Sequence, residues 1–531
     1  MMDGHVCDIS GSRMGIQTAR RTSFLFVITA LVLVLNGCDE PASTAVAEQV
    51  DSAIADSHVV EDSLTLDEGP AAFDMGRGLR DDGVSDVGAE ADGTTPDGDA
   101  GDSGMSVYAP YNGPSHVGLN VVSVDSEGAV LSAIEQAEAG QAITLAPGQY
   151  AFDRLIVVRA DGRPDAPIFF RAERLGDVVV TLSHIENFKI YGKHWVFENI
   201  RFEGGCMDGS GCEHAFHLVG DADDVFMRNN EVLNFASHVK LNGEVNGDGP
   251  ARAFPDRAHF IGNVWRNERY ILNAAPHNIL NLDGGRNHVV RGNVFADFNP
   301  ASDSRRSASA IYPKASARGF LIEQNLIVCE RRRPAGETAR GIQLGDGAGA
   351  SICDGDPDGD GLGDCEVNGQ SQEGLVRNNI ILNCNNGGSS AGIMVSDDRD
   401  SLIAHNTVLF SAPRAGAFFV GNPRFETRWQ GNLIEGGFDI NFAQGTLNEA
   451  DNLLIEAGEV PRRFLAAQEG DLALQDQSVT VDLGPRLREV EYDFCGYPRH
   501  EMTARGAIDY ATSPSAPPCS ERIQTMFQRI P

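Results

Sequence analysis

Histidine and lysine stand at alternate positions of one short apolar segment, ASHVKLNG. If this segment is a strand with Val239 and Leu241 turned inward, His238 and Lys240 lie together on its outer face. Both side chains can transfer protons, and lysine also supplies a positive charge for an acidic substrate. We therefore predict a catalytic face that includes His238 and Lys240.

Other short apolar segments carry polar side chains in the same way. The further outward candidates are His217 in HAFHLVG, Asn281 and Asp283 in HNILNLDGG, Tyr312 and Lys314 in SAIYPKASA, and Gln343 in RGIQLGDG. The alternative interpretation is a polar solvent face, which a strand-built fold has in any case. Tyr312 and Lys314 join Lys240 in the predicted site only if the segments stack side by side.

A recurring asparagine followed by a short apolar-rich stretch predicts that stacking. The asparagines, at intervals of 20 to 54 residues, are Asn199, Asn230, Asn263, Asn293, Asn325, Asn379, Asn406, Asn432 and Asn452. Such a period is typical of repeat units that bury their apolar face only against their neighbours. Asparagine tolerates the left-handed conformation of a tight corner, and its amide can bond to the asparagines above and below. The pattern predicts an all-β chain, a single-stranded right-handed parallel β-helix.

Residues before the repeats suit the open end of such a stack. Residues 128–140 have the apolar spacing of a short amphipathic helix, and residues 142–150 read as a strand followed by a Pro-Gly turn. A helix laid over the first coil would cover its unpaired edge. This helix-and-strand phrase resembles the start of the pectate-lyase-like superfamily. We expect the β-helix domain to span residues 111–520, with a C-terminal tail at 521–531.

The chemistry that this face would suit is β-elimination of a uronate-containing polysaccharide. The reaction needs a cation to neutralise the sugar carboxylate and a base to remove the neighbouring proton. The coil order resembles the chondroitinase B and alginate lyase family, and the resemblance implies that Lys240 is the base. The family has an arginine on the next coil, where this chain reads Leu280-Asn-Leu-Asp283; Arg286, three residues further, is the substitute that we expect.

Three other functions are compatible with the same residues. A non-catalytic surface protein would need the durable fold but no turnover. A sugar C5-epimerase would use His238 and Tyr312 for proton transfer on opposite faces. Zinc could bind His214, His217 and Cys212, although a disulfide at Cys212 would consume the thiol. A Ser-His-Asp hydrolase is disfavoured because no nucleophile elbow is visible.

The N-terminal residues 1–38 predict export. Arg20 and Arg21 precede an apolar run, Phe24 to Leu35, that is too short for a spanning helix. The run ends in Leu35-Asn-Gly-Cys38, which resembles the bacterial lipoprotein signal and implies lipid attachment at Cys38. The alternative is an ordinary secretory signal. We expect a monomer in the cell envelope, on the extracytoplasmic side, held to the membrane only by its lipid.

Residues 39–110 are strongly acidic. They hold 18 Asp and Glu against two Arg, a net charge of −16 of the chain's −34. With almost no aromatic residues, this composition predicts a disordered tether. The remaining acidity does not exclude an anionic ligand on the folded body. We expect no nucleic-acid binding, because no basic stripe with interleaved aromatics is present.

Eight of the ten cysteines remain after Cys7 and Cys38 are set aside, an even number for an oxidising compartment. Local spacing and coil positions predict four disulfides: Cys206–Cys212, Cys353–Cys365, Cys329–Cys384 and Cys495–Cys519.

The gap between Asn325 and Asn379 contains an insertion at 346–370 that predicts a calcium loop. Carboxylates alternate with glycines in CDGDPDGDGLGDC, at Asp354, Asp356, Asp358, Asp360 and Asp364. Calcium prefers six to eight oxygen ligands, which such a loop can supply. The pattern resembles the thrombospondin type 3 calcium repeat, implying a structural Ca²⁺ ion. A solvated acidic loop is the alternative.

Overall fold

The structure is a computed structural model of the whole chain. It describes residues 113–530 apart from gaps at 207–210, 245–252, 272–276, 299–307, 316, 333–338, 346–352, 355–363, 366–370, 385–389, 397, 411–417, 420–426, 441–447, 476–482 and 511–516. The chain divides into two units, Met1–Pro96 and Asp97–Pro531. The first unit, with the predicted signal and most of the predicted tether, lies outside the described residues. No described helix is long and apolar enough to cross a membrane.

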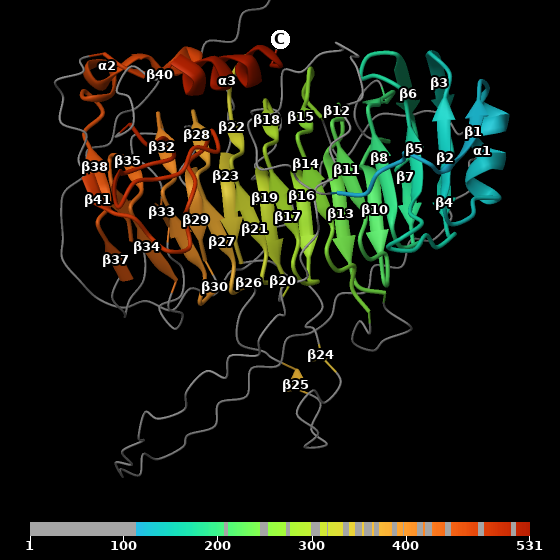
Figure 1. The fold of residues 1–531 in the computed structure, drawn as a ribbon, viewed down its shortest axis with the longest axis horizontal. Helices are drawn as coiled ribbons and strands as arrows, with labels where there is room; N and C mark the ends of the chain where they lie inside the picture. The colour runs from blue at the N-terminus through green and yellow to red at the C-terminus, as the bar shows by residue number, and fades with distance from the viewer. Residues whose placement is uncertain are drawn as a thin grey trace, which may run out of the picture. The chain divides into compact units, whose positions relative to one another are not determined.

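Three long parallel sheets form the body, because most coils contribute one strand to each sheet (Figure 1). The first sheet consists of β1 (Asn120–Val124), β2 (Gln141–Leu145), β5 (Ile168–Arg171), β8 (Trp195–Glu198), β11 (Phe226–Arg228), β14 (His259–Ile261), β17 (Val289–Arg291), β21 (Leu321–Glu323), β27 (Leu375–Arg377), β31 (Leu402–Ala404), β34 (Arg428–Gln430) and β37 (Asn448–Ala450).

The second sheet contains β3 (Gly148–Phe152), β6 (Val178–Leu182), β9 (Arg201–Gly204), β12 (Glu231–Leu233), β15 (Val264–Arg266), β18 (Val294–Ala296), β22 (Leu326–Val328), β28 (Ile380–Leu382), β32 (Thr407–Leu409), β35 (Leu433–Glu435) and β38 (Leu453–Ile455). The third sheet contains β4 (Ile156–Val158), β7 (Glu186–Ile190), β10 (His214–Val219), β13 (Ser237–Asn242), β16 (His277–Asp283), β19 (Ala308–Lys314), β23 (Ala339–Leu344) and β29 (Ala391–Val395). The predicted right-handed parallel β-helix is confirmed.

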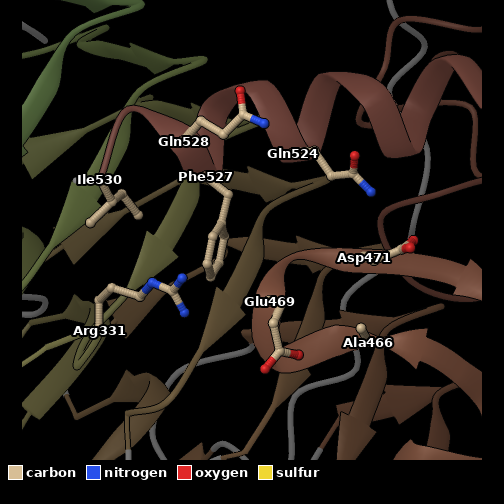
Figure 2. A pocket seen from close by; sticks show the side chains of 8 residues that line it. All are labelled: Arg331, Ala466, Glu469, Asp471, Gln524, Phe527, Gln528 and Ile530. Carbon is tan, nitrogen blue, oxygen red and sulfur yellow. The ribbon is translucent and has the colours of Figure 1, made fainter.

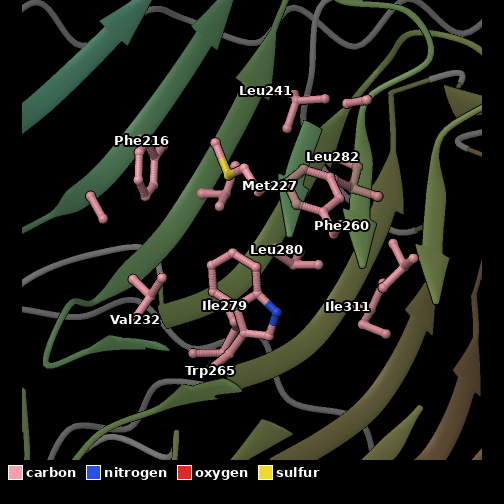
Figure 3. Close-up of a cluster of buried hydrophobic side chains, with 14 of the residues drawn as sticks. Phe216, Met227, Val232, Leu241, Phe260, Trp265, Ile279, Leu280, Leu282 and Ile311 are labelled. Atoms are coloured by element: carbon pink, nitrogen blue, oxygen red, sulfur yellow. The ribbon is translucent and has the colours of Figure 1, made fainter. Parts of the chain in front are cut away.

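The inward side chains of all three sheets form one continuous apolar core. Phe216, Trp265 and Ile279 are among its fully covered members, and Figure 3 shows them meeting in the interior. Aromatic rings pack on one another from coil to coil; Phe188 and Phe216, for example, stack with their centroids 5.4 Å apart. Because each coil covers its neighbours, burial accumulates along the stack.

A ladder of asparagine amides runs along one corner, from Asn230 to Asn452. At a typical rung, Asn263 Nδ2 donates to Asn293 Oδ1 at 3.1 Å and to the Met227 carbonyl at 2.8 Å. Its Oδ1 accepts from the backbone and side-chain nitrogens of Asn230, at 2.9 and 3.2 Å. Every polar atom of the amide therefore has a partner, as burial requires. The predicted stacking of asparagines is confirmed for these coils.

Two details of the asparagine prediction are wrong. Asn199 is not a rung, because Arg201 pairs with Glu231, so that Ile200 takes the ladder position and Asn199 lies one residue earlier. The left-handed corner residue is the one before each ladder asparagine, as at Asn229 (φ 50°) and Gly262 (φ 65°). The ladder asparagines thus supply the hydrogen bonds, and the preceding residues supply the turn.

Short elements cover the two ends and one outer face. Helix α1 (Glu127–Glu135) buries Val130 and Ile134 against the first coil, as predicted for the capping helix. At the other end, α2 (Val460–Arg463), β39 (Phe464–Ala466) and β40 (Asp471–Leu474) precede the hairpin of β41 (Leu483–Pro485) and β42 (Met502–Ala504).

The last helix, α3 (Pro517–Gln528), packs on the outer face of the second sheet (Figure 1). Ile523 and Phe527 of α3 join an apolar cluster with outward residues of that sheet, among them Val294 and Leu326. Residues 521–530, predicted to be a tail, are therefore part of the body. The sequence did not predict this helix, because its apolar residues are buried only by the apolar outer side of the second sheet, which the sequence did not reveal.

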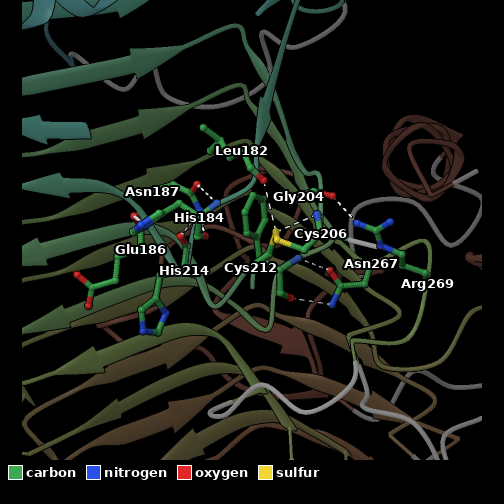
Figure 4. The surroundings of a disulfide bond; sticks show 11 residues. Leu182, His184, Glu186, Asn187, Gly204, Cys206, Cys212, His214, Asn267 and Arg269 are labelled. Atoms are coloured by element: carbon green, nitrogen blue, oxygen red, sulfur yellow. Dashed lines mark hydrogen bonds between the residues drawn. A yellow bond between two sulfur atoms is a disulfide. The ribbon is translucent and has the colours of Figure 1, made fainter. Parts of the chain in front are cut away.

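Three of the four predicted disulfides are present. Cys206–Cys212 closes a short loop (Figure 4), Cys329–Cys384 joins adjacent coils, and Cys495–Cys519 ties α3 to the segment before it. The fourth prediction falls largely outside the described residues. The backbones of β24 (Cys353–Asp354) and β25 (Asp364–Cys365) pair antiparallel, with Cys353 opposite Cys365. Asp356, Asp358 and Asp360 lie outside the described part of the chain.

Five two-residue strands form two further small parallel sheets. They are β20 (Ala317–Arg318), β26 (Ser371–Gln372) and β30 (Asp398–Arg399), which pair with one another, and β33 (Phe418–Phe419), which pairs with β36 (Phe438–Asp439).

Candidate functional site

The third sheet turns two rows of polar side chains away from the core. What we call the central row contains Lys189, His217, Lys240, Asn281 and Tyr312, each paired in register with the next. The residues on either side of the first four, such as Val239 and Leu241, belong to the core, as does Ile311 before Tyr312. Because strand residues alternate, the row itself faces outward. The adjacent row contains Val219, Asn242, Asp283 and Lys314.

His217 lies between residues of two other coils, with an oxygen atom close to each of its ring nitrogens. Nδ1 lies 3.1 Å from Oε1 of Glu186, and Nε2 contacts Oδ1 of Asn242. The Asn242 amide is oriented by its own bond, because Nδ2 donates to the Gly243 carbonyl at 2.8 Å. Burial lowers the pKa of His217 to about 4, with Asn242 and Glu186 opposing that shift. The imidazole is therefore neutral at pH 7 and has a single N–H to donate. Both atoms that face its nitrogens are acceptor oxygens, and the carboxylate of Glu186 favours the tautomer with the proton on Nδ1, in which the contact of Nε2 with Asn242 is not a hydrogen bond.

Glu186 links His217 to a second cation. Its Oε2 accepts from Nζ of Lys189 at 3.1 Å, while its Oε1 faces His217. Burial raises the pKa of Glu186, but His217 and Lys189 outweigh it, so that the pKa is lowered overall. Glu186 was not among the predicted site residues. Glu186 stands in register with His214, on the strand that also carries His217. An alignment of the coils by their register would have placed Glu186 near His217.

Lys240 stands beside His217 on the next coil and is partly exposed. Its ammonium makes no hydrogen bond or ion pair with any described residue. The following side chain in the row, Asn281, is 2% exposed, and its Oδ1 finds no hydrogen-bond partner within the described ranges. Buried amides are rarely left in this state without a ligand or water to satisfy them. Lys240 and Asn281 thus offer unused hydrogen-bonding capacity side by side.

Tyr312 and Lys314 lie where the sequence predicts, on the same face as Lys240 and two strands further along. Lys314 Nζ is 3.1 Å from Oδ1 of Asp283 and 5.2 Å from the centre of the Tyr312 ring. Burial raises the pKa of Asp283, although Lys314 opposes the shift. Beyond them, Ser309 Oγ donates to Gln343 Oε1 at 2.7 Å, which gives this end of the face a fixed hydrogen-bond pattern.

His238 is not on the outer face, and that part of the prediction is wrong. The strand bends at its start, so His238 is fully buried and aligns with core residues Ala215 and Ile279 of the neighbouring strands. Its ring packs against Phe235 and Trp265. Burial lowers the pKa of His238 to about 3. An alternating pattern does not reveal such a bend.

Arg286 is also in a different place from the one expected. It follows Gly284 and Gly285, both with positive φ, at the corner between the third and first sheets. There its backbone nitrogen donates to Asp256 Oδ1 at 2.7 Å, and its backbone bridges to Arg318. The residue that faces Lys240 on the next coil is Asn281. Arg286 therefore does not extend the row that contains Lys240.

The zinc alternative loses its thiol, because Cys212 is bonded to Cys206 and accepts a hydrogen bond from its backbone nitrogen (Figure 4). No group of three or more His, Cys, Asp or Glu suited to a metal ion occurs among the residues that the structure describes. Three of the five predicted calcium ligands, Asp356, Asp358 and Asp360, lie in a gap, so the predicted loop site stays a prediction.

A separate pocket of about 510 Å³ opens beside α3 (Figure 2). Arg331, Glu469, Asp471 and Phe527 line it, together with Ala466, Gln524, Gln528 and Ile530. The Arg331 guanidinium lies 4.3 Å from the centre of the Phe527 ring. None of the central row reaches this pocket, which belongs to the segment covering the second sheet. We place the candidate site on the third sheet, where the neutral His217 lies close to Lys240 and Asn281, whose ammonium and amide oxygen have no hydrogen-bond partner in the described part of the chain.

No protein-family model matches the chain, and no curated protein sequence gives a significant match. Among solved structures, an alginate lyase from Paenibacillus sp. str. FPU-7 is similar over 63% of this chain and 99% of its own, at 13% identity and a TM-score of 0.36. Pectate lyase Pel9A is similar over 71% of this chain and 90% of its own, at 13% identity and a TM-score of 0.40. The PL6 family polysaccharide lyase Pedsa3628 from Pseudopedobacter saltans is similar over 67% of this chain and 96% of its own, at 13% identity and a TM-score of 0.36. This distant likeness is one of fold, the stacked parallel β-helix, and says nothing about activity.

Proposed function

We propose that the third sheet binds an extracellular polysaccharide rich in uronate and cleaves it by β-elimination. The observation that carries the proposal is the register pair His217 and Lys240, a neutral imidazole beside an ammonium that makes no hydrogen bond or ion pair with any residue the structure describes. Neighbouring strands are ~4.8 Å apart, so both side chains can reach one sugar residue. The row continues over successive coils, which suits a linear polymer.

Lys240 and His217 have different roles in the proposed reaction. An ammonium at Lys240 neutralises the sugar carboxylate, which makes the hydrogen on the neighbouring carbon more acidic. The imidazole of His217, oriented by Glu186, accepts that proton on Nε2 once the substrate displaces the Asn242 contact. The electron pair of the broken C–H bond forms a carbon–carbon double bond, and the bond to the leaving glycosidic oxygen breaks. Water protonates that oxygen.

This assignment moves the base from Lys240, where the family resemblance puts it, to His217. An ordinary lysine is a cation at neutral pH, whereas His217 is held neutral by burial. Asn281 supplies hydrogen bonds to sugar hydroxyls, and Tyr312 with Lys314 contacts the next residue of the polymer.

A set of variants tests the assignment on alginate, chondroitin and pectin, with the ultraviolet absorbance of the unsaturated product as readout. We expect Lys240→Ala to lose activity and Lys240→Arg to keep part of it, because arginine keeps the charge. If Lys240 were the base, Lys240→Arg would be as inactive as the alanine variant, since arginine does not deprotonate. Lys193→Ala is the matched control; its side chain is 36% exposed and pairs with Asp221 at a corner. Absence of product from all three polymers with the unaltered protein would refute the lyase proposal.

A non-catalytic glycan-binding protein is the second candidate. The unsatisfied Asn281 amide and the unpaired Lys240 favour it, because both would bind a sugar chain without turnover. Retained binding of one of the polymers by the unaltered protein, without unsaturated product, would support this function instead.

We also propose that the protein works outside the cytoplasm, attached through a lipid on Cys38. The three disulfides support an oxidising compartment. Labelling with a radioactive fatty acid, compared between the unaltered chain and Cys38→Ser, tests the attachment. For the loop containing Asp354 and Asp364, we propose a structural Ca²⁺ ion, supported by the alternating carboxylates and the antiparallel pairing at its base.

A further inference from the structure

A second cation without an ion-pair partner among the described residues, Arg159, lies beside the third sheet, far from Lys240 along the stack. Arg159 directly follows β4, and Tyr191 directly follows β7. Val158 pairs with Ile190, and the Tyr191 nitrogen donates to the Val158 carbonyl at 2.8 Å, so Arg159 and Tyr191 occupy neighbouring coils at the same position. The guanidinium lies over the Tyr191 ring, 4.8 Å from its centre.

Arg159 is exposed and forms no ion pair with any residue in the described ranges, although the chain has a net charge of −34. Two other cations of this face form ion pairs: Lys189 pairs with Glu186, and Lys314 with Asp283. A guanidinium stacked on an aromatic ring is positioned in advance while its N–H groups stay available at the edge. Those N–H groups match the two oxygens of a carboxylate.

Register places this pair on the same outward face as the proposed site. Ile190 pairs with Leu218, so Tyr191 stands in the adjacent row before Val219 and Asn242. From the coil of Arg159 to that of Lys240 there are three strand steps, β4 to β7 to β10 to β13, or ~14 Å at ~4.8 Å a step. A polymer lying along the stack over Lys240 therefore passes over Arg159.

We propose that Arg159 and Tyr191 form a remote binding subsite for a second uronate residue of the same polymer. The inference rests on the proposed function and adds a length requirement to it. Arg159 binds the carboxylate, and Tyr191 holds the guanidinium in place and contacts the sugar. An oligomer long enough to reach both cations binds more tightly than a shorter one, because its second contact is intramolecular.

The test measures the affinity of alginate, pectate and chondroitin oligomers of graded length by calorimetry, using the full chain and its variants. For oligomers that span ~14 Å, we expect Arg159→Gln to weaken binding by about fivefold, a modest factor because the site is exposed. For shorter oligomers the affinity stays unchanged. Tyr191→Ala reproduces part of the loss and Tyr191→Phe does not, because phenylalanine retains the ring. Arg174→Gln is the control; its side chain is 82% exposed, in a loop after the first-sheet strand β5.

Each outcome decides between the proposals. If Arg159→Gln leaves the affinity unchanged at every length, or weakens short and long oligomers equally, the remote subsite is wrong and the proposed function stands. If the unaltered chain binds none of the oligomers, the proposed function fails and the subsite fails with it. A length-dependent loss without any unsaturated product supports the subsite and assigns the face to binding alone.

Discussion

Asn293 and Asn325 lie on adjacent coils with their amides in contact, Nδ2 of the first 3.0 Å from Oδ1 of the second. The same Oδ1 accepts from the Asn293 backbone nitrogen at 2.9 Å. Both asparagines are completely buried. One amide oxygen therefore satisfies both the backbone and the side chain of the neighbouring coil, so the coils depend on each other for hydrogen bonding as well as for apolar burial.

Replacing one rung should destabilise the protein strongly. In Asn293→Ala, the partners left behind include the Asn263 backbone nitrogen and the Phe260 carbonyl. Since each buried unsatisfied group costs about 1–3 kcal/mol, we expect the free energy of unfolding to fall by about 3 kcal/mol. Denaturant unfolding followed by circular dichroism measures this. Asn448→Ala, at an exposed position of β37, should be close to neutral, and a similar loss there would contradict the explanation.

The buried histidines should make the protein less stable in acid. Burial lowers the pKa of His238 to about 3, and of His259 and His288 to about 4 each. Because the unfolded chain binds these protons near pH 6.5 and the folded chain does not, stability falls as the pH drops from about 6.5 towards 4. Burial also raises the pKa of several carboxylates, that of Asp398 to about 6, which acts in the opposite direction. Other carboxylates, such as Glu186, have a lowered pKa and act in the same direction as the histidines.

Unfolding midpoints measured between pH 4 and pH 8 check this expectation. The slope should be shallower by about one proton in His238→Phe, since that variant removes one titrating group. A stability that is flat or rises on acidification would show that the carboxylates dominate instead.

The pH profile of turnover should report the state of His217. Protonation of the imidazole removes the base, so the acid limb of kcat/KM, which reports the free protein, should appear near the pKa of His217, about 4. Glu186 raises this pKa, and Glu186→Gln should therefore move the limb to lower pH while reducing kcat through the lost orientation. An acid limb that moves to higher pH in this variant would exclude the assigned pair.

The apolar contact of α3 should be essential for stability. Ile523 is completely buried against the outer side of the second sheet, and Ile523→Ala should cost about 2–5 kcal/mol. Thr525, on the exposed side of the same helix, is the control, and its alanine variant should unfold at nearly the same temperature. Equal stability of both variants would show that α3 is dispensable.

Calcium should raise the melting temperature if the acidic loop binds it. A ligand that binds only the folded state stabilises it in proportion to the logarithm of its concentration over its dissociation constant. We expect a titratable increase with Ca²⁺ that is reversed by chelation and absent when Asp354 and Asp364 are both changed to Asn. An increase that persists in the double variant would place the ion elsewhere.

The stacked fold was predictable because its signal repeats along the chain. The spacing of the ladder asparagines and the alternation after them specify a coil and its neighbour. Coil positions predicted the Cys329–Cys384 disulfide, and short spacing predicted Cys206–Cys212. The one-residue offset at Asn199 was not predictable from an isolated Asn, because the corner accepts asparagine at the left-handed position as well as at the ladder position.

The site was predictable only in part, for a different reason. Lys240, Tyr312 and Lys314 follow from alternation within one strand. The partnership of His217 with Glu186 depends on two strands 31 residues apart, and the burial of His238 depends on a bend that brings it against Trp265. Which cations have an ion-pair partner on another coil, and that Lys240 has none among the described residues, can be seen only in the folded structure.

The step from Asn325 to Asn379 spans 54 residues, yet its amide contact is 2.9 Å, like that of rungs half as long. Strands on both sides keep their pairing, with Leu321 opposite Leu375 and Leu326 opposite Ile380. The length of chain between two rungs is thus independent of how the rungs meet. A foreign domain grafted into this long interval should be tolerated, which makes the protein a natural scaffold for displaying added modules.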